Sequence, residues 1–223
     1  MVTPLAVTDP WVRWDWVSTH LDEIGAATRE HVVFTLVAIA IGLAVSFPLA
    51  LAARRWRWLA TPILSATGIL YTIPSLALFA LFVPWTGLSR TTAEIGLVSY
   101  TLLILIRNIV TGLDGVPTDV REAARGMGFG PLRMLLRIEL PLAAPVIVAG
   151  IRIATVTTIG LVTVTAFIGQ GGLGRLILDG LTRDFRTPLV VGSVLSVALA
   201  VVADVGLAGL QRVLTPWARK GTR

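Results

Sequence analysis

The residues that could do chemistry in this sequence are few, and their types favour charge pairing over catalysis or metal binding. The chain has no cysteine, and its two histidines, His20 and His31, have no partners at a metal-ligand spacing. It also has no G-x-x-x-x-G-K-S/T segment, the loop that cradles the phosphates of ATP in many ATPases. We therefore predict no catalytic residue, no metal site and no cofactor bound by this chain.

The densest group of charged side chains is the stretch 117–141, which lies between two long apolar segments. Charged side chains and loose backbone are costly in hydrocarbon, so such a stretch between membrane spans must lie in water. Its pattern predicts two short helices. Asp119 and Glu122 are spaced to cap the first helix. Gly128 suits a left-handed stop after that helix, and Pro131 suits the first turn of the second.

The rest of the sequence supplies the membrane spans that must position this stretch. The 223 residues are 55% hydrophobic and only 14% charged, with a mean hydropathy of +0.81. Five apolar runs cover residues 32–53, 59–83, 93–113, 142–168 and 189–210. The length of each run is close to the ~20 residues that a helix needs to cross a bilayer. All seven tryptophans lie outside these runs, as in the interfacial belt of a membrane protein. We predict an all-α integral membrane protein with five transmembrane helices, and a polar loop over residues 175–187.

The basic residues predict the orientation of these spans. Eleven of the nineteen Lys and Arg residues fall on one side, six on the other, and two, Arg107 and Arg152, within spans. Cytoplasmic loops are enriched in Lys and Arg, so the N-terminus should lie outside and the C-terminus inside. The net charge of +6 fits this topology and lipid headgroups, so we predict no nucleic-acid partner. The expected organisation is a periplasmic or interfacial segment 1–30, a transmembrane domain 31–212 with a cytoplasmic loop 114–140, and a cytoplasmic tail 213–223.

Seven positions of the polar stretch follow a fixed pattern: E-A-A, three residues, G, nine residues, I-x-L-P. The residues that fit it are Glu122, Ala123, Ala124, Gly128, Ile138, Leu140 and Pro141. This pattern resembles the "EAA" cytoplasmic loop of ABC-importer permeases. The resemblance implies that the loop forms short coupling helices, which rest in a groove of a separate ATPase subunit. An ordinary helix-turn-helix loop between two spans is the alternative interpretation.

Within the loop, the resemblance implies that Glu122, Ala123, Ala124 and Gly128 seat the coupling helix against the ATPase. Small residues allow close contact, a glycine allows the turn, and charge fixes the docking. Three arginines could pair with acidic groups of the ATPase or with lipid phosphates, and the sequence does not separate these two roles. They are Arg125, Arg133 and Arg137.

Further segments resemble one subfamily, the permeases of osmoprotectant importers, which take up glycine betaine, proline betaine, carnitine or choline. These segments are residues 71–77, 107–108, 139–143, 149–152 and 167–174. The similarity covers about residues 31–212 and implies a type I ABC-importer permease fold in the inner membrane of a bacterium. Methionine-importer permeases share the layout and the loop, so they remain the alternative. Gln170 departs from the subfamily, which carries a small residue there.

The resemblance also implies partners. The chain would work with two ATP-binding subunits, which hold ATP and Mg²⁺, so this chain would not be an enzyme. A second copy of the permease, or a sister permease, would complete the path across the lipid bilayer. An extracytoplasmic substrate-binding protein would deliver the solute.

Several residues at membrane depth are candidates for the translocation path. Arg107 and Arg152 need water, a partner or a function there, and Asp204 is the expected partner of Arg152. A structural ion pair or snorkelling of the side chain is the alternative to a direct part in the path. Tyr71, with Tyr100 and Phe79, could face a quaternary ammonium group or could simply pack between helices.

Glycines form the last group of candidates. The segment with Gly171, Gly172 and Gly174 could be an external gate or a tight bend of the chain. Four other glycines should allow close contact between helices, namely Gly42, Gly150, Gly160 and Gly192.

Two other classes of function compete with an ATP-driven importer. A secondary transporter usually carries acidic residues near the midplane and inverted repeats. This sequence offers only Asp204 well inside a span and Glu94 near an end, with no visible repeat. Uptake that depends on an ion gradient and ignores ATP would favour that class. A structural membrane scaffold is the third possibility, and the loop pattern argues against it.

Overall fold

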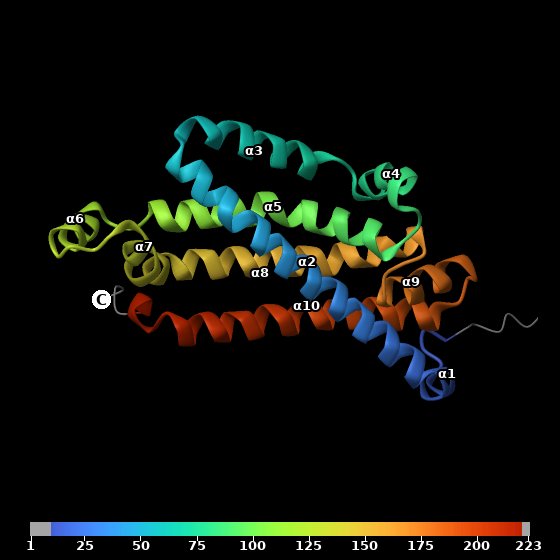
Figure 1. The fold of residues 1–223 in the computed structure, drawn as a ribbon. Helices are drawn as coiled ribbons and strands as arrows, with labels where there is room; N and C mark the ends of the chain where they lie inside the picture. The colour runs from blue at the N-terminus through green and yellow to red at the C-terminus, as the bar shows by residue number, and fades with distance from the viewer. Residues whose placement is uncertain (1–9, 220–223) are drawn as a thin grey trace, which may run out of the picture.

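The computed structural model describes residues 10–219, and within this range the chain is helical, with no strand. Three long helices run side by side: α5 (Arg90–Asp114), α8 (Leu140–Val164) and α10 (Arg186–Leu214). A fourth, α2 (Leu21–Arg55), crosses them obliquely (Figure 1). α5 contacts both α2 and α8 along its length, so it is the centre of the bundle.

Shorter elements lie at the two ends of the bundle (Figure 1). At one end, called the loop end below, α6 (Thr118–Gly126) and α7 (Pro131–Met134) lie with the turn between α2 and α3 (Arg57–Thr72). α1 (Trp14–Thr19), α4 (Ser75–Thr86) and α9 (Leu173–Thr182) lie at the other end, called the opposite end below. The remaining turns are Leu135–Glu139, Thr165–Ile168 and Pro216–Arg219.

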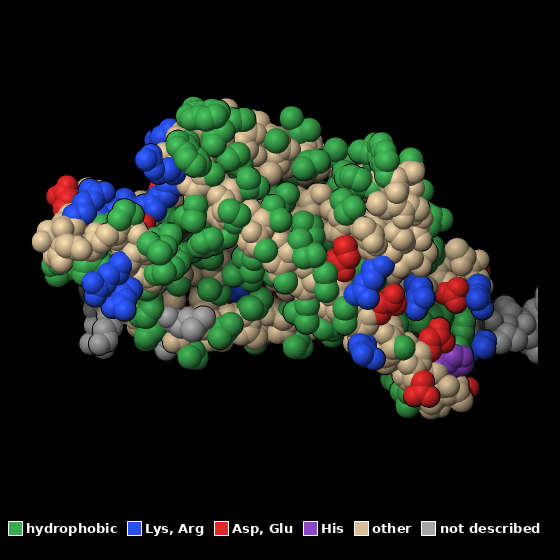
Figure 2. Space-filling view, in the orientation of Figure 1, with side chains coloured by type: hydrophobic (Ala, Val, Ile, Leu, Met, Phe, Trp, Pro, Cys, Tyr) green, Lys and Arg blue, Asp and Glu red, His purple; other side chains and the backbone are tan. Residues whose placement is uncertain are grey.

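On the face shown in Figure 2, apolar side chains are spread over the middle, while charged side chains gather mainly at the two ends. Within residues 10–219, four helical stretches are long and apolar enough to cross a membrane: Leu21–Arg55, Arg90–Asp114, Pro131–Ile168 and Arg186–Val213. α3 and α4 form a fifth crossing when taken as a bent pair. The prediction of an all-α membrane protein is confirmed, with four candidate spans in the described residues, or five if the bent pair is counted as one.

The second predicted span, residues 59–83, is wrong as a single helix. α3 and α4 meet at an angle of 100°. Pro74 causes the break, because a proline disfavours helical backbone at the residue before it, and Ile73 is extended with φ −68° and ψ 129°. The hydroxyl of Tyr100 donates a hydrogen bond to the Ile73 carbonyl. This bond satisfies a backbone group that the break would otherwise leave unpaired in an apolar environment.

The prediction of a polar loop over residues 175–187 is also wrong, because α9 occupies most of it. Leu173 and Leu176 of this helix are buried against Ile24 and Ala27 of α2. α2 itself begins at Leu21, well before the apolar run that starts near residue 32. Packing of apolar faces therefore extends helices beyond the stretches that hydropathy marks.

Glycines allow the closest approach between helices at several of the expected positions. A Cβ at Gly150 of α8 would lie 2.3 Å from the Cβ of Asn108 on α5. A Cβ at Gly42 would lie 2.1 Å from the Thr101 hydroxyl oxygen. A Cβ at Gly192 would lie 2.9 Å from the Leu173 carbonyl oxygen. Gly160 makes no such contact within the described part of this chain, because no other side chain or helix lies within 4 Å of its Cβ position.

These two glycines of α8 give a matched pair of substitutions. Gly150→Ala is expected to lower the free energy of unfolding by about 1–3 kcal/mol, because the added methyl group must push α5 and α8 apart. Gly160→Ala adds the same methyl group to open space and is expected to be neutral or slightly stabilising. Thermal unfolding in detergent, followed by tryptophan fluorescence, measures both. Equal effects of the two substitutions would contradict the tight α5–α8 contact.

Candidate functional site

The polar stretch folds as two short helices that project from the loop end (Figure 1). Gly128 has φ +79° and forms the predicted left-handed stop just after α6. Pro131 is the first residue of α7, as predicted. The predicted cap at Asp119 is wrong. The N-cap position lies two residues earlier, at Pro117, so α6 begins at Thr118 and Asp119 lies in its first turn. A carboxylate there still favours the helix, because it faces the positive end of the helix dipole.

The predicted docking residues of the loop are mostly on the surface. Glu122, Ala123, Arg125 and Gly128 are exposed, whereas Ala124 is buried and holds α6 against the bundle. Large apolar side chains are exposed beside them, namely Met127, Leu132 and Leu136. Arg133 and Arg137 are also exposed, and the guanidinium of Arg133 lies 4.8 Å from the centre of the Phe129 ring. A surface that mixes exposed apolar groups with charges is typical of a protein-binding site.

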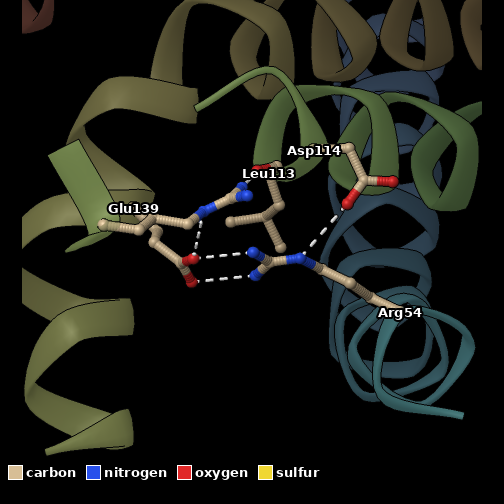
Figure 3. A network of polar contacts seen from close by, with 5 residues as sticks. Arg54, Leu113, Asp114 and Glu139 are labelled. Carbon is tan, nitrogen blue, oxygen red and sulfur yellow. Dashed lines mark hydrogen bonds and ion pairs between the residues drawn. The ribbon is translucent and has the colours of Figure 1, made fainter. Parts of the chain in front are cut away.

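A buried carboxylate fixes this loop to the bundle. Glu139 is 6% exposed and accepts two hydrogen bonds from Arg54 of α2, at 2.8 and 2.6 Å (Figure 3). Arg121 of α6 forms an ion pair with the same carboxylate, with 2.9 Å between Nε and Oε1. Arg54 also lies 3.2 Å from Asp114, at the end of α5 (Figure 3). Bidentate pairs of this kind are the strong form of ionic hydrogen bond.

Arg121 makes a further contact that closes the network. It donates a hydrogen bond to the Leu113 carbonyl in the last turn of α5, which also accepts one from the Val116 backbone N–H just beyond the helix. Glu139 and its two arginines therefore link four elements: α2, α6 and the turn Leu135–Glu139 directly, and α5 through the arginines. This turn is π-helical, a geometry that is rare and often occurs at functional sites.

This network was not predicted from the sequence. Arg54 and Arg121 are among the basic residues that predict the topology, and Glu139 belongs to a segment that resembles the subfamily, but no pairing between them was expected. The available signal was the acidic residue itself, because Glu139 stands directly before a long apolar run. A carboxylate at such a boundary needs a partner, but its partners are far away in the sequence and only the fold brings them together.

A second polar contact lies between α8 and α10, at membrane depth. Arg152 and Asp204 form a bidentate ion pair, from Nε to Oδ1 at 3.0 Å and from Nη2 to Oδ2 at 2.9 Å. The predicted pairing is confirmed. Arg152 also donates from Nη1 to the Gln211 Oε1 atom at 3.2 Å, and the Gln211 amide donates to the Pro145 carbonyl at 2.9 Å. The pair lines a groove of about 600 Å³.

The other predicted path residues do not gather at this groove. Arg107 is exposed on α5, and the groove's lining does not include it. Tyr71 lies at the end of α3 and meets Tyr100 edge-on, with 5.7 Å between the ring centres. Phe79 is fully buried, and the Tyr100 hydroxyl is engaged with Ile73, so these two rings pack inside the fold.

The glycine-rich segment lies at the opposite end and is buried. Gly171 and Gly172 have φ values of +106° and +46°, which residues other than glycine rarely adopt. A Cβ at Gly172 would lie 2.6 Å from the Ala27 carbonyl of α2, and one at Gly174 2.3 Å from the Thr163 carbonyl of α8. The segment is thus packed tightly between α2 and α8, and its role as a gate stays a prediction.

Comparison with known proteins places these features in context. The family described as binding-protein-dependent transport system inner membrane component matches residues 32–220. The osmoprotectant import permease protein OsmW of Salmonella typhimurium is 41% identical, over 94% of this chain and 100% of that protein. The choline transport system permease protein OpuBB of Bacillus subtilis is 38% identical, over 90% of this chain and 93% of that protein.

A solved structure shares the fold. The MetNI methionine ABC transporter, in an inward-facing conformation, contains a chain that superposes with a TM-score of 0.73. The superposition covers 83% of this chain and 93% of that chain, at 22% sequence identity. The expected permease fold is confirmed by this match, while the identity is too low to carry substrate specificity.

The network at Glu139 makes a testable prediction. Glu139→Gln is expected to lower the free energy of unfolding by about 2 kcal/mol, because it removes the carboxylate charge from the largely buried Arg121 and leaves Arg54 with only the half-exposed Asp114. Asp114→Asn is the control, since its half-exposed carboxylate contacts only Arg54 and should contribute less than about 1 kcal/mol. Thermal unfolding measures both. Trypsin cleavage after the exposed Arg125 should also become faster in Glu139→Gln alone, and unchanged cleavage would contradict the anchoring of α6.

Proposed function

The chain belongs to the family of binding-protein-dependent transport system inner membrane components, and from this premise we propose that it is the permease subunit of an ATP-driven importer of osmoprotectants. The solute class is that of its relatives, which are named for choline, for glycine betaine, carnitine and choline, or for osmoprotectants in general. The identity of 35–41% to these relatives supports this class over methionine, because the methionine transporter shares the fold at only 22% identity.

The energy for import would come from separate ATP-binding subunits, which we propose bind the loop end in two copies and hold ATP and Mg²⁺. The exposed face of α6 and α7 supports this assignment. It presents Glu122 and Ala123 beside the apolar side chains of Met127 and Leu132, all on the surface. Arg121 anchors α6 to the bundle through Glu139, so a push on α6 would reach α2 and α5 directly. A loose loop could not pass on such a force.

The remaining partners follow from the same proposal. A second copy of this chain, or a sister permease, would complete the path, and a substrate-binding protein would dock at the opposite end. We also propose the organisation expected from the sequence, with a transmembrane domain over residues 31–212, a cytoplasmic coupling loop at 114–140 and a cytoplasmic tail at 213–223. In this arrangement the loop end faces the cytoplasm, where ATP is available.

The docking of α6 is tested by reversing one exposed charge. Glu122→Lys is expected to leave thermal unfolding unchanged, because exposed substitutions alter stability by less than about 0.5 kcal/mol. It is expected to abolish ATP-driven uptake of radiolabelled glycine betaine by the complete transporter in proteoliposomes. Arg57→Glu is the control, since it reverses an exposed charge at the same end but outside α6. Full uptake by Glu122→Lys would overturn the docking role.

The orientation is tested by labelling, which the absence of native cysteine makes simple. Arg125→Cys in α6 should react with a membrane-impermeant maleimide only in inside-out vesicles. Arg183→Cys, at the exposed C-cap position just after α9, should react only in right-side-out vesicles. The reverse pattern would place the loop outside the cell, away from ATP, and would overturn the proposed mechanism.

A further inference from the structure

The ion pair of Arg152 and Asp204 is in an unusual place for a purely structural contact. It lies between α8 and α10, about twelve residues, or ~18 Å, along α8 from its start, which is near the middle of a span. The two side chains are nevertheless 29% and 41% exposed. Charges at this depth that face lipid are costly, so the exposed side of the pair must face protein or a water-filled path.

The groove around the pair has the size and lining of a small-molecule site. Its volume of about 600 Å³ falls within the roughly 300–1,000 Å³ of typical ligand pockets. Apart from the ion pair, its walls are aliphatic or small, and several wall residues have exposed side chains. The wall residues with large exposed side chains are Ile153, Val156, Val201 and Val205.

Both charged groups keep unused hydrogen-bonding capacity. A guanidinium has five N–H donors, and Arg152 directs three of them at Asp204 and Gln211. A carboxylate has about four lone-pair sites, and Asp204 uses two of them on Arg152. The pair therefore presents one positive and one negative group, side by side, to whatever enters the groove.

We propose that this groove is a transient binding site for a zwitterionic solute with a carboxylate and a quaternary ammonium group, of the kind named for the relatives of this chain. The carboxylate of the solute binds the free N–H groups of Arg152. The ammonium group has no N–H to donate, so it needs a nearby negative charge and apolar contacts for its methyl groups. Asp204 supplies the charge, and Val201 and Val205 supply the apolar wall. This inference rests on the proposed function.

Such a site is expected to be weak, which suits a transport path. Arg152 and Asp204 already neutralise each other. The solute therefore gains only the remaining hydrogen bonds of Arg152 and the attraction between its own two charged groups and the opposite charges of the pair. A site on a path must bind its solute well enough to admit it and weakly enough to release it. We therefore expect binding of glycine betaine in the millimolar range.

Direct binding to the assembled transporter tests the site. The purified complex, without its substrate-binding protein, is titrated with glycine betaine and, separately, with choline, and binding is followed by saturation-transfer NMR. Choline shares the quaternary ammonium group but lacks the carboxylate. Arg152→Gln is expected to weaken glycine betaine about tenfold, since it removes a charged hydrogen bond, and to change choline by less than about threefold. Asp204→Asn is expected to weaken both ligands.

Two further variants separate this site from a structural role. Arg183→Gln removes an exposed ion pair on α9 and should change neither affinity. Arg152→Lys keeps the charge with fewer hydrogen bonds and should show a smaller but still selective loss, which covers the case in which Arg152→Gln fails to assemble. Equal losses of both ligands in the Arg152 variants, or no binding by the unmodified complex, would overturn the site.

ATP-driven uptake, measured on the same unmodified complex with its binding protein, separates this inference from the proposed function. If the complex takes up glycine betaine but the Arg152 variants lose affinity for both ligands equally, the binding site is overturned and the proposed importer function stands. No uptake of any quaternary ammonium solute removes the proposed function, whatever the titrations show.

Discussion

The buried carboxylate of Glu139 is the constraint on which the loop end depends. A carboxylate with so little exposure is stable as an anion only if neighbouring charges and hydrogen bonds replace the water that it lost. Arg54 and Arg121 do so, and they come from α2 and α6. Because the charge cannot be left alone, the ends of these helices and of α5 are held in one arrangement. Short polar helices that would be marginal on their own thereby gain a fixed position.

This constraint gives the proposed importer a physical basis for transmitting force. α6 carries the exposed docking face, and its other side is attached to the bundle through Ala124 and Arg121. At the opposite end, the glycine segment packs against α2 and α8, and the buried ring of His31 on α2 is within hydrogen-bonding distance of the Ile159 carbonyl at 3.0 Å. Both ends of the bundle are thus tied to α2. In the proposed mechanism, the chain therefore moves largely as one body against its partner permease.

The sequence predicted the parts of this structure that depend on local chemistry. Gly128 and Pro131 were recognised because a left-handed stop and a first helical turn each favour one residue type. The pairing of Arg152 with Asp204 was predicted because two opposite charges at similar depth in a membrane have few other partners. The break at Ile73–Pro74 was missed. Pro62 lies within α3 without ending it, so a proline alone does not reveal which position breaks a helix.

What the sequence by itself determined is the membrane character of the chain, most of its candidate spans and the position of the polar loop, because hydropathy and charge act residue by residue. What only the tertiary structure decided is which distant residues meet. Arg54 and Glu139 are 85 positions apart, and nothing in their local sequence pairs them. α9 likewise became a helix because α2 and α10 cover its apolar face. Such contacts depend on how helices pack across the bundle, which the order of residues along any one segment does not express.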